Sequence, residues 1–117
     1  MSSAPLVDWE LVIERAGGRP ELAQELFQVM LSMLPDHFQI IAETLEARDH
    51  ERLEIEVHTL RGTLGYSGAK ALQDCAKAFD EYLRVGEIDA ITINNYHQQL
   101  LQLYQQLLAE AKDLLDK

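Results

Sequence analysis

Apolar residues recur at spacings of three and four along most of this chain, and short polar or glycine-containing segments separate the apolar stretches. This spacing matches the 3.6-residue turn of an α-helix and gives each helix one apolar face. Runs that alternate apolar and polar residues, which would predict strands, are few. The pattern therefore predicts an all-α protein.

Capping residues, glycines and prolines predict where five helices begin and end. We expect helices over Asp8–Ala16, Pro20–Ala47, about Asp49–Gly65, about Ala69–Arg84 and about Asp89–Leu115. Gly17 and Gly18 end the first of these helices, and Pro20 suits the first turn of the second. Pro35 lies inside the second helix and predicts a kink, although two shorter helices also satisfy the sequence.

Each expected helix carries an apolar stripe that should face a shared core. The stripes consist of Trp9, Ile13 and Ala16; Leu22, Leu26, Met30, Met33, His37, Ile41 and Leu45; Leu53, Val57, Leu60 and Leu64; Leu72, Ala76, Phe79 and Leu83; and Ile93, Tyr96, Leu100, Tyr104, Leu107, Ala111 and Leu114. Short connections favour antiparallel neighbours. We therefore expect an antiparallel up-down four-helix bundle with a short additional N-terminal helix, formed by one domain over residues 6–117 after a tail of residues 1–5.

Charge and composition narrow the classes of partner. The chain has 10 basic and 20 acidic residues, a formal net charge of −10, which opposes binding to nucleic acid. No stretch approaches the roughly 18 apolar residues of a membrane span, and the first residues lack the basic start of a signal peptide. We therefore expect a cytoplasmic domain that contacts neither nucleic acid nor membrane. The single cysteine, Cys75, allows no internal disulfide and is interpreted as a half-buried structural thiol.

His58 differs from the other residues of its helix because it lies roughly 120° from the centre of the apolar stripe, at about 100° per residue. It should therefore face outward. Arg61, Gly62 and Gly65 follow it at i+3, i+4 and i+7, so they flank it on the helix surface. A metal site is disfavoured, because none of the four histidines has the glutamate three residues earlier that di-iron bundles use.

An exposed imidazole near neutral pH is a competent nucleophile, and these neighbours suit a phosphoryl acceptor. Gly62 leaves room for a tetrahedral group, Arg61 offers N–H donors, and Glu54 at i−4 is a candidate partner for the other ring nitrogen. The alternative is a surface histidine beside glycines that merely allow close helix packing. The residues alone leave both interpretations open.

The stretch His58-x-x-Arg61-Gly62, followed by Gly65, Gly68 and Leu72, resembles the signature H-x-L-K-G-x-x-x-x-x-G-x-x-x-L of histidine-containing phosphotransfer (HPt) domains. The resemblance extends over the bundle and over the glycine-proline junction before its first long helix. It implies that a receiver domain's phospho-aspartate passes its phosphoryl group to His58, which hands it to an aspartate on a second receiver.

The resemblance also implies roles for neighbouring residues. Arg61 would stabilise the phosphoryl group in place of the commoner lysine, and Gly62 would keep the approach open. Asp80 occupies the position, 22 residues after the histidine, where the family often has a Gln or Glu that bonds the imidazole. A receiver would dock on residues around the site, for which the candidates are Leu11, Ile55, Gly65, Lys77 and Arg84.

We therefore expect a monomeric phosphorelay module that binds response-regulator receiver domains. It should bind no metal or cofactor of its own, with Mg²⁺ held by the receiver, and should lack autonomous kinase activity because it has no recognisable nucleotide-binding loop. It is either a stand-alone shuttle or the C-terminal domain of a hybrid sensor kinase. The alternatives are a non-catalytic helical adaptor and a dimerisation and phosphoacceptor unit of a dimeric kinase.

Overall fold

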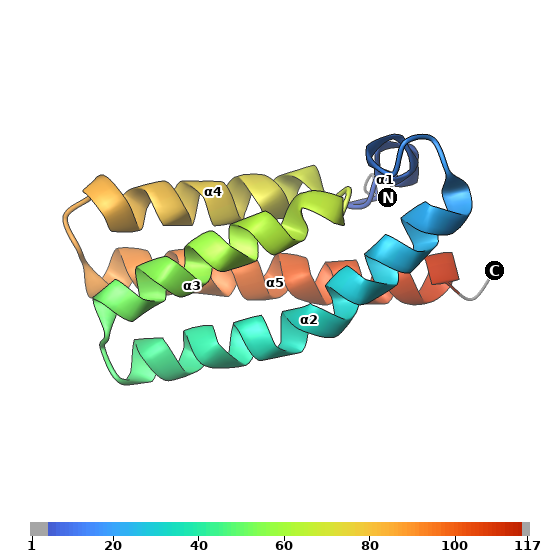
Figure 1. The fold of residues 1–117 in the computed structure, drawn as a ribbon. Helices are drawn as coiled ribbons and strands as arrows, with labels where there is room; N and C mark the ends of the chain where they lie inside the picture. The colour runs from blue at the N-terminus through green and yellow to red at the C-terminus, as the bar shows by residue number, and fades with distance from the viewer. Residues whose placement is uncertain (1–4, 116–117) are drawn as a thin grey trace.

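The computed structural model describes residues 5–115, and helices α2 to α5 form an antiparallel bundle with α1 placed across one end (Figure 1). The elements are α1 (Trp9–Arg15), α2 (Pro20–Glu46), α3 (His50–Thr63), a 3-10 turn (Leu64–Tyr66), α4 (Lys70–Val85) and α5 (Ala90–Leu115). Within the described residues, the β pairing is limited to an isolated bridge between Val7 and Ala69. The predicted all-α four-helix bundle with a short N-terminal helix is confirmed. Most of the predicted tail, residues 1–4, lies outside the described residues.

The predicted helix boundaries agree closely with the structure. The Asp8 side chain accepts a hydrogen bond from the Leu11 amide at 3.2 Å and caps α1. Gly17 and Gly18 have φ values of 72° and 79°, which end α1 in a backbone conformation that favours glycine. Helix α2 runs without interruption through Pro35, which excludes two shorter helices, and its axis bends near its middle (Figure 1).

The predicted core stripes of α3 and α4 are buried throughout, but the stripe of α2 was placed partly on the wrong face. Met33 is 45% exposed, whereas Phe27 and Leu34 are fully buried. Apolar residues occupy adjacent positions at 26–27 and 33–34, so the sequence offers two stripes about 100° apart. The stripe with Phe27 and Phe38 fills the core, and this assignment depends on packing that the spacing does not specify.

The turn between α3 and α4 anchors α1 through Gly68. The Asp8 amide donates to the Gly68 carbonyl oxygen at 2.9 Å, next to the Val7–Ala69 bridge. Gly68 has φ +63°, and a Cβ built there would lie 2.5 Å from Val12 Cγ2 and 2.7 Å from the Asp8 carbonyl oxygen. Glycine is therefore required at this position for both its backbone conformation and the close approach of α1.

Helix α5 holds the same end of the molecule through Glu110. Its two carboxylate oxygens accept the backbone amides of Leu6 and Val7, each at 2.8 Å. Trp9 of α1 packs edge-to-face on Phe27 of α2, with ring centroids 5.2 Å apart. These contacts fix α1 to the bundle.

Among the helices of residues 5–115, none combines the length and the apolar composition that a membrane span requires.

Candidate functional site

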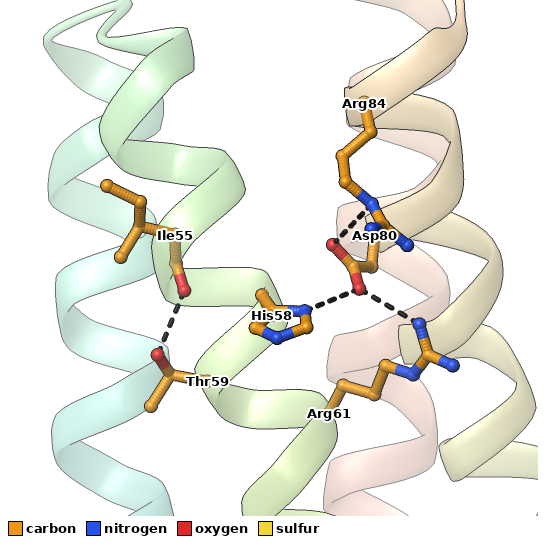
Figure 2. A network of polar contacts seen from close by, with 6 residues as sticks. All are labelled: Ile55, His58, Thr59, Arg61, Asp80 and Arg84. Carbon is orange, nitrogen blue, oxygen red and sulfur yellow. Dashed lines mark hydrogen bonds and ion pairs between the residues drawn. The ribbon is translucent and has the colours of Figure 1, made fainter.

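The apolar stripe of α3 determines where His58 points. Leu53, Val57 and Leu60 are fully buried against the core, so His58 lies on the outer surface of the helix and its side chain is 65% exposed. The predicted outward orientation is confirmed. His58 faces α4, where Asp80 meets it (Figure 2).

Asp80 binds one nitrogen of the His58 ring. Its Oδ2 lies 2.9 Å from His58 Nδ1, and its side chain is completely buried. Burial alone raises the pKa of a carboxyl group, but the hydrogen bonds from His58 and Arg61, together with the charges of His58 and Arg84, hold the pKa of Asp80 below its ordinary value. An ionised carboxylate only accepts hydrogen bonds, so Nδ1 carries a proton, and in the neutral form of the ring the lone pair is on Nε2. Figure 2 shows the second ring nitrogen pointing away from Asp80.

Two arginines approach the same carboxylate from different sides. Arg61 Nη1 donates to Asp80 Oδ2 at 3.0 Å. Arg84 Nε lies 3.7 Å from Oδ1, and Oδ1 has no hydrogen-bond partner among residues 5–115. Asp80 is thus the shared centre of an imidazole and two guanidinium groups.

Gly62 and Gly65, which follow His58 along the chain, both have open space where a side chain would stand. A Cβ added at either position would meet no atom of the described chain within 4 Å. Close helix packing therefore does not explain these two glycines, which was the alternative interpretation from the sequence. The open surface at Gly62 is compatible with the approach of a group from outside.

A recess of about 260 Å³ lies beside the imidazole and is lined by Glu54, Ile55, His58, Thr59, Asp80 and Arg84. Ile55 is 59% exposed here, and the Thr59 hydroxyl donates to the Ile55 carbonyl oxygen at 2.9 Å (Figure 2). Glu54 was a candidate partner for the ring, but the carboxylate that bonds to Nδ1 is that of Asp80. The carboxylate that bonds to the ring therefore comes from the facing helix α4, and not from the preceding turn of α3.

The other predicted contact residues lie outside this recess. Leu11 is partly buried on α1, and Lys77 is exposed on α4 about one turn before Asp80. The Gly65 carbonyl oxygen accepts from Arg15 Nη1 at 2.8 Å, so this glycine adjoins α1. Contact of these residues with a receiver stays a prediction.

Sequence reasoning missed the inward contact of Arg84 and the position of Thr59 in the recess. Arg84 follows Asp80 at i+4, a spacing that places opposite charges side by side on a helix. That signal was present in the sequence. It was interpreted only as positive charge for a partner, because the burial of Asp80 was not evident from the sequence.

The other histidines and the cysteine lie apart from the His58 site. In the part of the chain that the structure describes, no group of three or more His, Cys, Asp or Glu residues is arranged to hold a metal ion. His37 Nε2 lies 3.0 Å from the Thr63 hydroxyl, and burial lowers the pKa of His97. Burial raises the pKa of the Cys75 thiol to about 11, and the thiol is therefore neutral near pH 7 and unreactive.

Comparison with known proteins identifies the family of this chain. A model of the Hpt domain family matches residues 25–117. Over 80 residues the chain is 31% identical to the signal transduction histidine-protein kinase BarA of Escherichia coli (strain K12) and to that of Shigella flexneri. These residues are 68% of this chain but 9% of each kinase, so the chain corresponds to a small part of the relatives' length.

A solved structure shows the same fold. The HPT domain from the Hpt sensor hybrid histidine kinase from Shewanella superposes with a TM-score of 0.84 over 95% of this chain and 94% of that chain, at 21% sequence identity. The assignment to a family rests on the family model, which covers most of the chain. The chain belongs to the Hpt domain family, whose members perform histidine-mediated phosphotransfer in two-component phosphorelay signalling.

Proposed function

We propose that His58 is the phosphoacceptor, taking a phosphoryl group from the phospho-aspartate of one receiver domain and passing it to an aspartate of another. The observation that carries this proposal is the fixed imidazole: Asp80 binds Nδ1, the His58 side chain is 65% exposed, and the surface at Gly62, one turn along α3, is open. A nucleophile with its lone pair directed outward meets the first requirement for in-line transfer from a docked partner.

The proposed transfer needs no base, because the attacking nitrogen Nε2 has no proton to lose. The Nε2 lone pair attacks phosphorus, a nitrogen–phosphorus bond forms as the bond to the aspartyl oxygen breaks, and the receiver's carboxylate leaves. Nδ1 keeps its proton, so the ring becomes cationic and the Asp80 carboxylate 2.9 Å away stabilises it. The reverse step returns a neutral imidazole, and the group can move in either direction.

Arg61 is the proposed cation for the oxygens of the phosphoryl group, and Gly62 the residue that keeps the approach clear. Hpt domains of hybrid kinases interact with receiver domains, and Ile55 beside His58 is the proposed apolar contact for such a partner. Leu11, Gly65, Lys77 and Arg84 are the other proposed contacts. Mg²⁺ is expected in the receiver's active site, and this domain contributes the acceptor.

Incubation with a receiver phosphorylated on its aspartate tests the proposal. Acid-labile phosphate should appear on the wild-type protein and on His50→Gln, and should be absent from His58→Gln. His50 is the matched control because it is an exposed histidine on the same helix, about two turns away. Label that persists on His58→Gln would contradict the assignment and favour another acceptor, and absence of label from the wild type would favour the adaptor alternative.

A further inference from the structure

The Asp80 carboxylate is bonded unevenly. Its Oδ2 receives hydrogen bonds from both His58 and Arg61, at 2.9 and 3.0 Å. Its Oδ1 is buried and receives none from residues 5–115, although Arg84 Nε stands 3.7 Å away. That distance exceeds a hydrogen bond by less than about 1 Å. Arg84 is therefore placed close to an acceptor that it does not yet use.

Arg61 is directed at Asp80 in the structure, so it would have to turn to bond a phosphoryl group on Nε2. Its guanidinium lies on the Asp80 side of the imidazole, whereas Nε2 points to the opposite side (Figure 2). The Arg61 side chain is 32% exposed, so it has space on its outer side to turn. This step rests on the proposed function, in which a dianionic phosphoryl group on Nε2 attracts Arg61 more strongly than a single carboxylate does.

The departure of Arg61 would leave Asp80 in an unfavourable state. Its side chain is 0% exposed in the structure, and Arg61 supplies one of the two hydrogen bonds to Oδ2. A buried charge that loses one partner is strongly destabilised, because the partner offset its desolvation. The phosphorylated ring, itself cationic, would still donate to Oδ2, but Oδ1 receives no hydrogen bond from residues 5–115, so a second guanidinium on that side would offset the loss of Arg61.

We propose that Arg84 takes over the charge of Asp80 when Arg61 turns to the phosphoryl group, and is thus a positioning residue for the transfer. Arg84 sits at i+4 from Asp80 on α4, so the two stay adjacent whatever α3 does. Its side chain is 47% exposed and lines the recess beside His58, so closing onto Oδ1 requires only a small rotation into that space. Arg84 would then hold Asp80 on Nδ1 while Arg61 is engaged elsewhere.

A double-mutant cycle on the transfer rate tests this role. The rate of His58 phosphorylation by a phosphorylated receiver is measured for wild type, Arg84→Gln, Asp80→Asn and the double variant, with circular dichroism melts to confirm folding. Arg84→Gln should slow transfer about tenfold, as expected for loss of a partly exposed partner of a buried charge. In the Asp80→Asn background the same substitution should cost less than about twofold, because a neutral amide needs no counter-ion.

Lys77→Gln is the matched comparison, since it removes the same charge from α4 without touching Asp80. A cation that only attracts an acidic receiver gives an equal loss in both Asp80 backgrounds, and that loss fades between 0.1 and 0.5 M salt because screening lengths shorten to a few Å. The Arg84→Gln loss should persist at high salt, and Arg84→Lys should recover most of the rate.

Equal losses for Arg84→Gln in the two backgrounds, or a loss that salt abolishes, would overturn the role of Arg84. Those outcomes leave the proposed function standing, provided that wild type is labelled and His58→Gln is not. If His58→Gln is labelled as strongly as wild type, the proposed function and the role of Arg84 fall together.

Discussion

Two glycine positions of one short sequence signature have opposite surroundings. A Cβ at Gly62 would meet no described atom within 4 Å, whereas a Cβ at Gly68 would meet Val12 at 2.5 Å and the Asp8 carbonyl oxygen at 2.7 Å. Gly68 also has a positive φ of 63°, and Gly62 lies in regular α-helix. In this signature Gly68 allows the close approach of α1, whereas Gly62 leaves a surface of α3 open.

The comparison predicts a large effect on stability at Gly68. Gly68→Ala should lower the free energy of unfolding by about 2 to 5 kcal/mol, the sum of left-handed backbone strain and overpacking against α1. Urea denaturation followed by circular dichroism measures this change. Gly65→Ala is the matched control, with an expected change below about 1 kcal/mol because its Cβ has space. An unchanged urea midpoint for Gly68→Ala would show that α1 yields easily and would remove the contrast.

Gly62 should behave in the opposite way. Gly62→Gln should slow phosphorylation of His58 by about tenfold or more, because the new side chain would lie one helical turn from His58 on the surface where the proposed receiver docks. The unfolding free energy should stay within about 1 kcal/mol of wild type. A transfer assay and a urea titration on the same preparation measure both quantities. Gly62→Ala should have an intermediate rate. A full transfer rate for Gly62→Gln would mean that the open surface at Gly62 has no part in the approach.

The difference between these glycines also indicates how far the sequence alone could lead. Gly68 lies between the helices predicted over about Asp49–Gly65 and about Ala69–Arg84, and both helices were predicted closely, because glycines and caps leave few alternatives. Asp80 was identified through the family resemblance, and its contact with His58 is confirmed at 2.9 Å. The helix wheel specified the outward direction of His58 because α3 has a single unambiguous stripe.

The predictions for α2 and α4 were wrong or incomplete where the spacing of residues along one helix permits two directions for the side chains. On α2 the neighbouring apolar pairs permitted two core faces, and Met33 was placed wrongly. On α4 the charge of Arg84 was compatible with facing a partner or facing Asp80, and only the packing of α3 against α4 decides between them. Side-chain direction within a charged cluster depends on tertiary contacts, which the period of one helix does not contain.

The smallest predicted effect concerns Glu110, which holds the Gly68 end of the molecule together. Burial raises the pKa of Glu110, but the backbone amides of Leu6 and Val7 and the side chain of Gln106 outweigh it, so its pKa lies below the ordinary value. The folded state therefore binds the Glu110 proton more weakly than the unfolded state does. Its stabilisation is complete above the unfolded value of about 4.3 and is lost as the pH falls through the lower folded value.

Glu110→Gln keeps the shape of the side chain but removes its charge, so it should lower the free energy of unfolding by about 1 kcal/mol at pH 7. Near pH 3 the difference from wild type should shrink, because below the unfolded value of about 4.3 the unfolded state binds the Glu110 proton more strongly than the folded state does. Urea titrations of both proteins at the two pH values measure this convergence, and the transfer rate at pH 7 should not change. A difference of equal size at both pH values would mean that shape, not charge, fastens residues 6 and 7 to α5. A slower transfer in Glu110→Gln would mean that contacts at the Gly68 end of the molecule affect the reaction at His58. That result would contradict the comparison of the two glycines, in which Gly68 affects stability and Gly62 affects transfer.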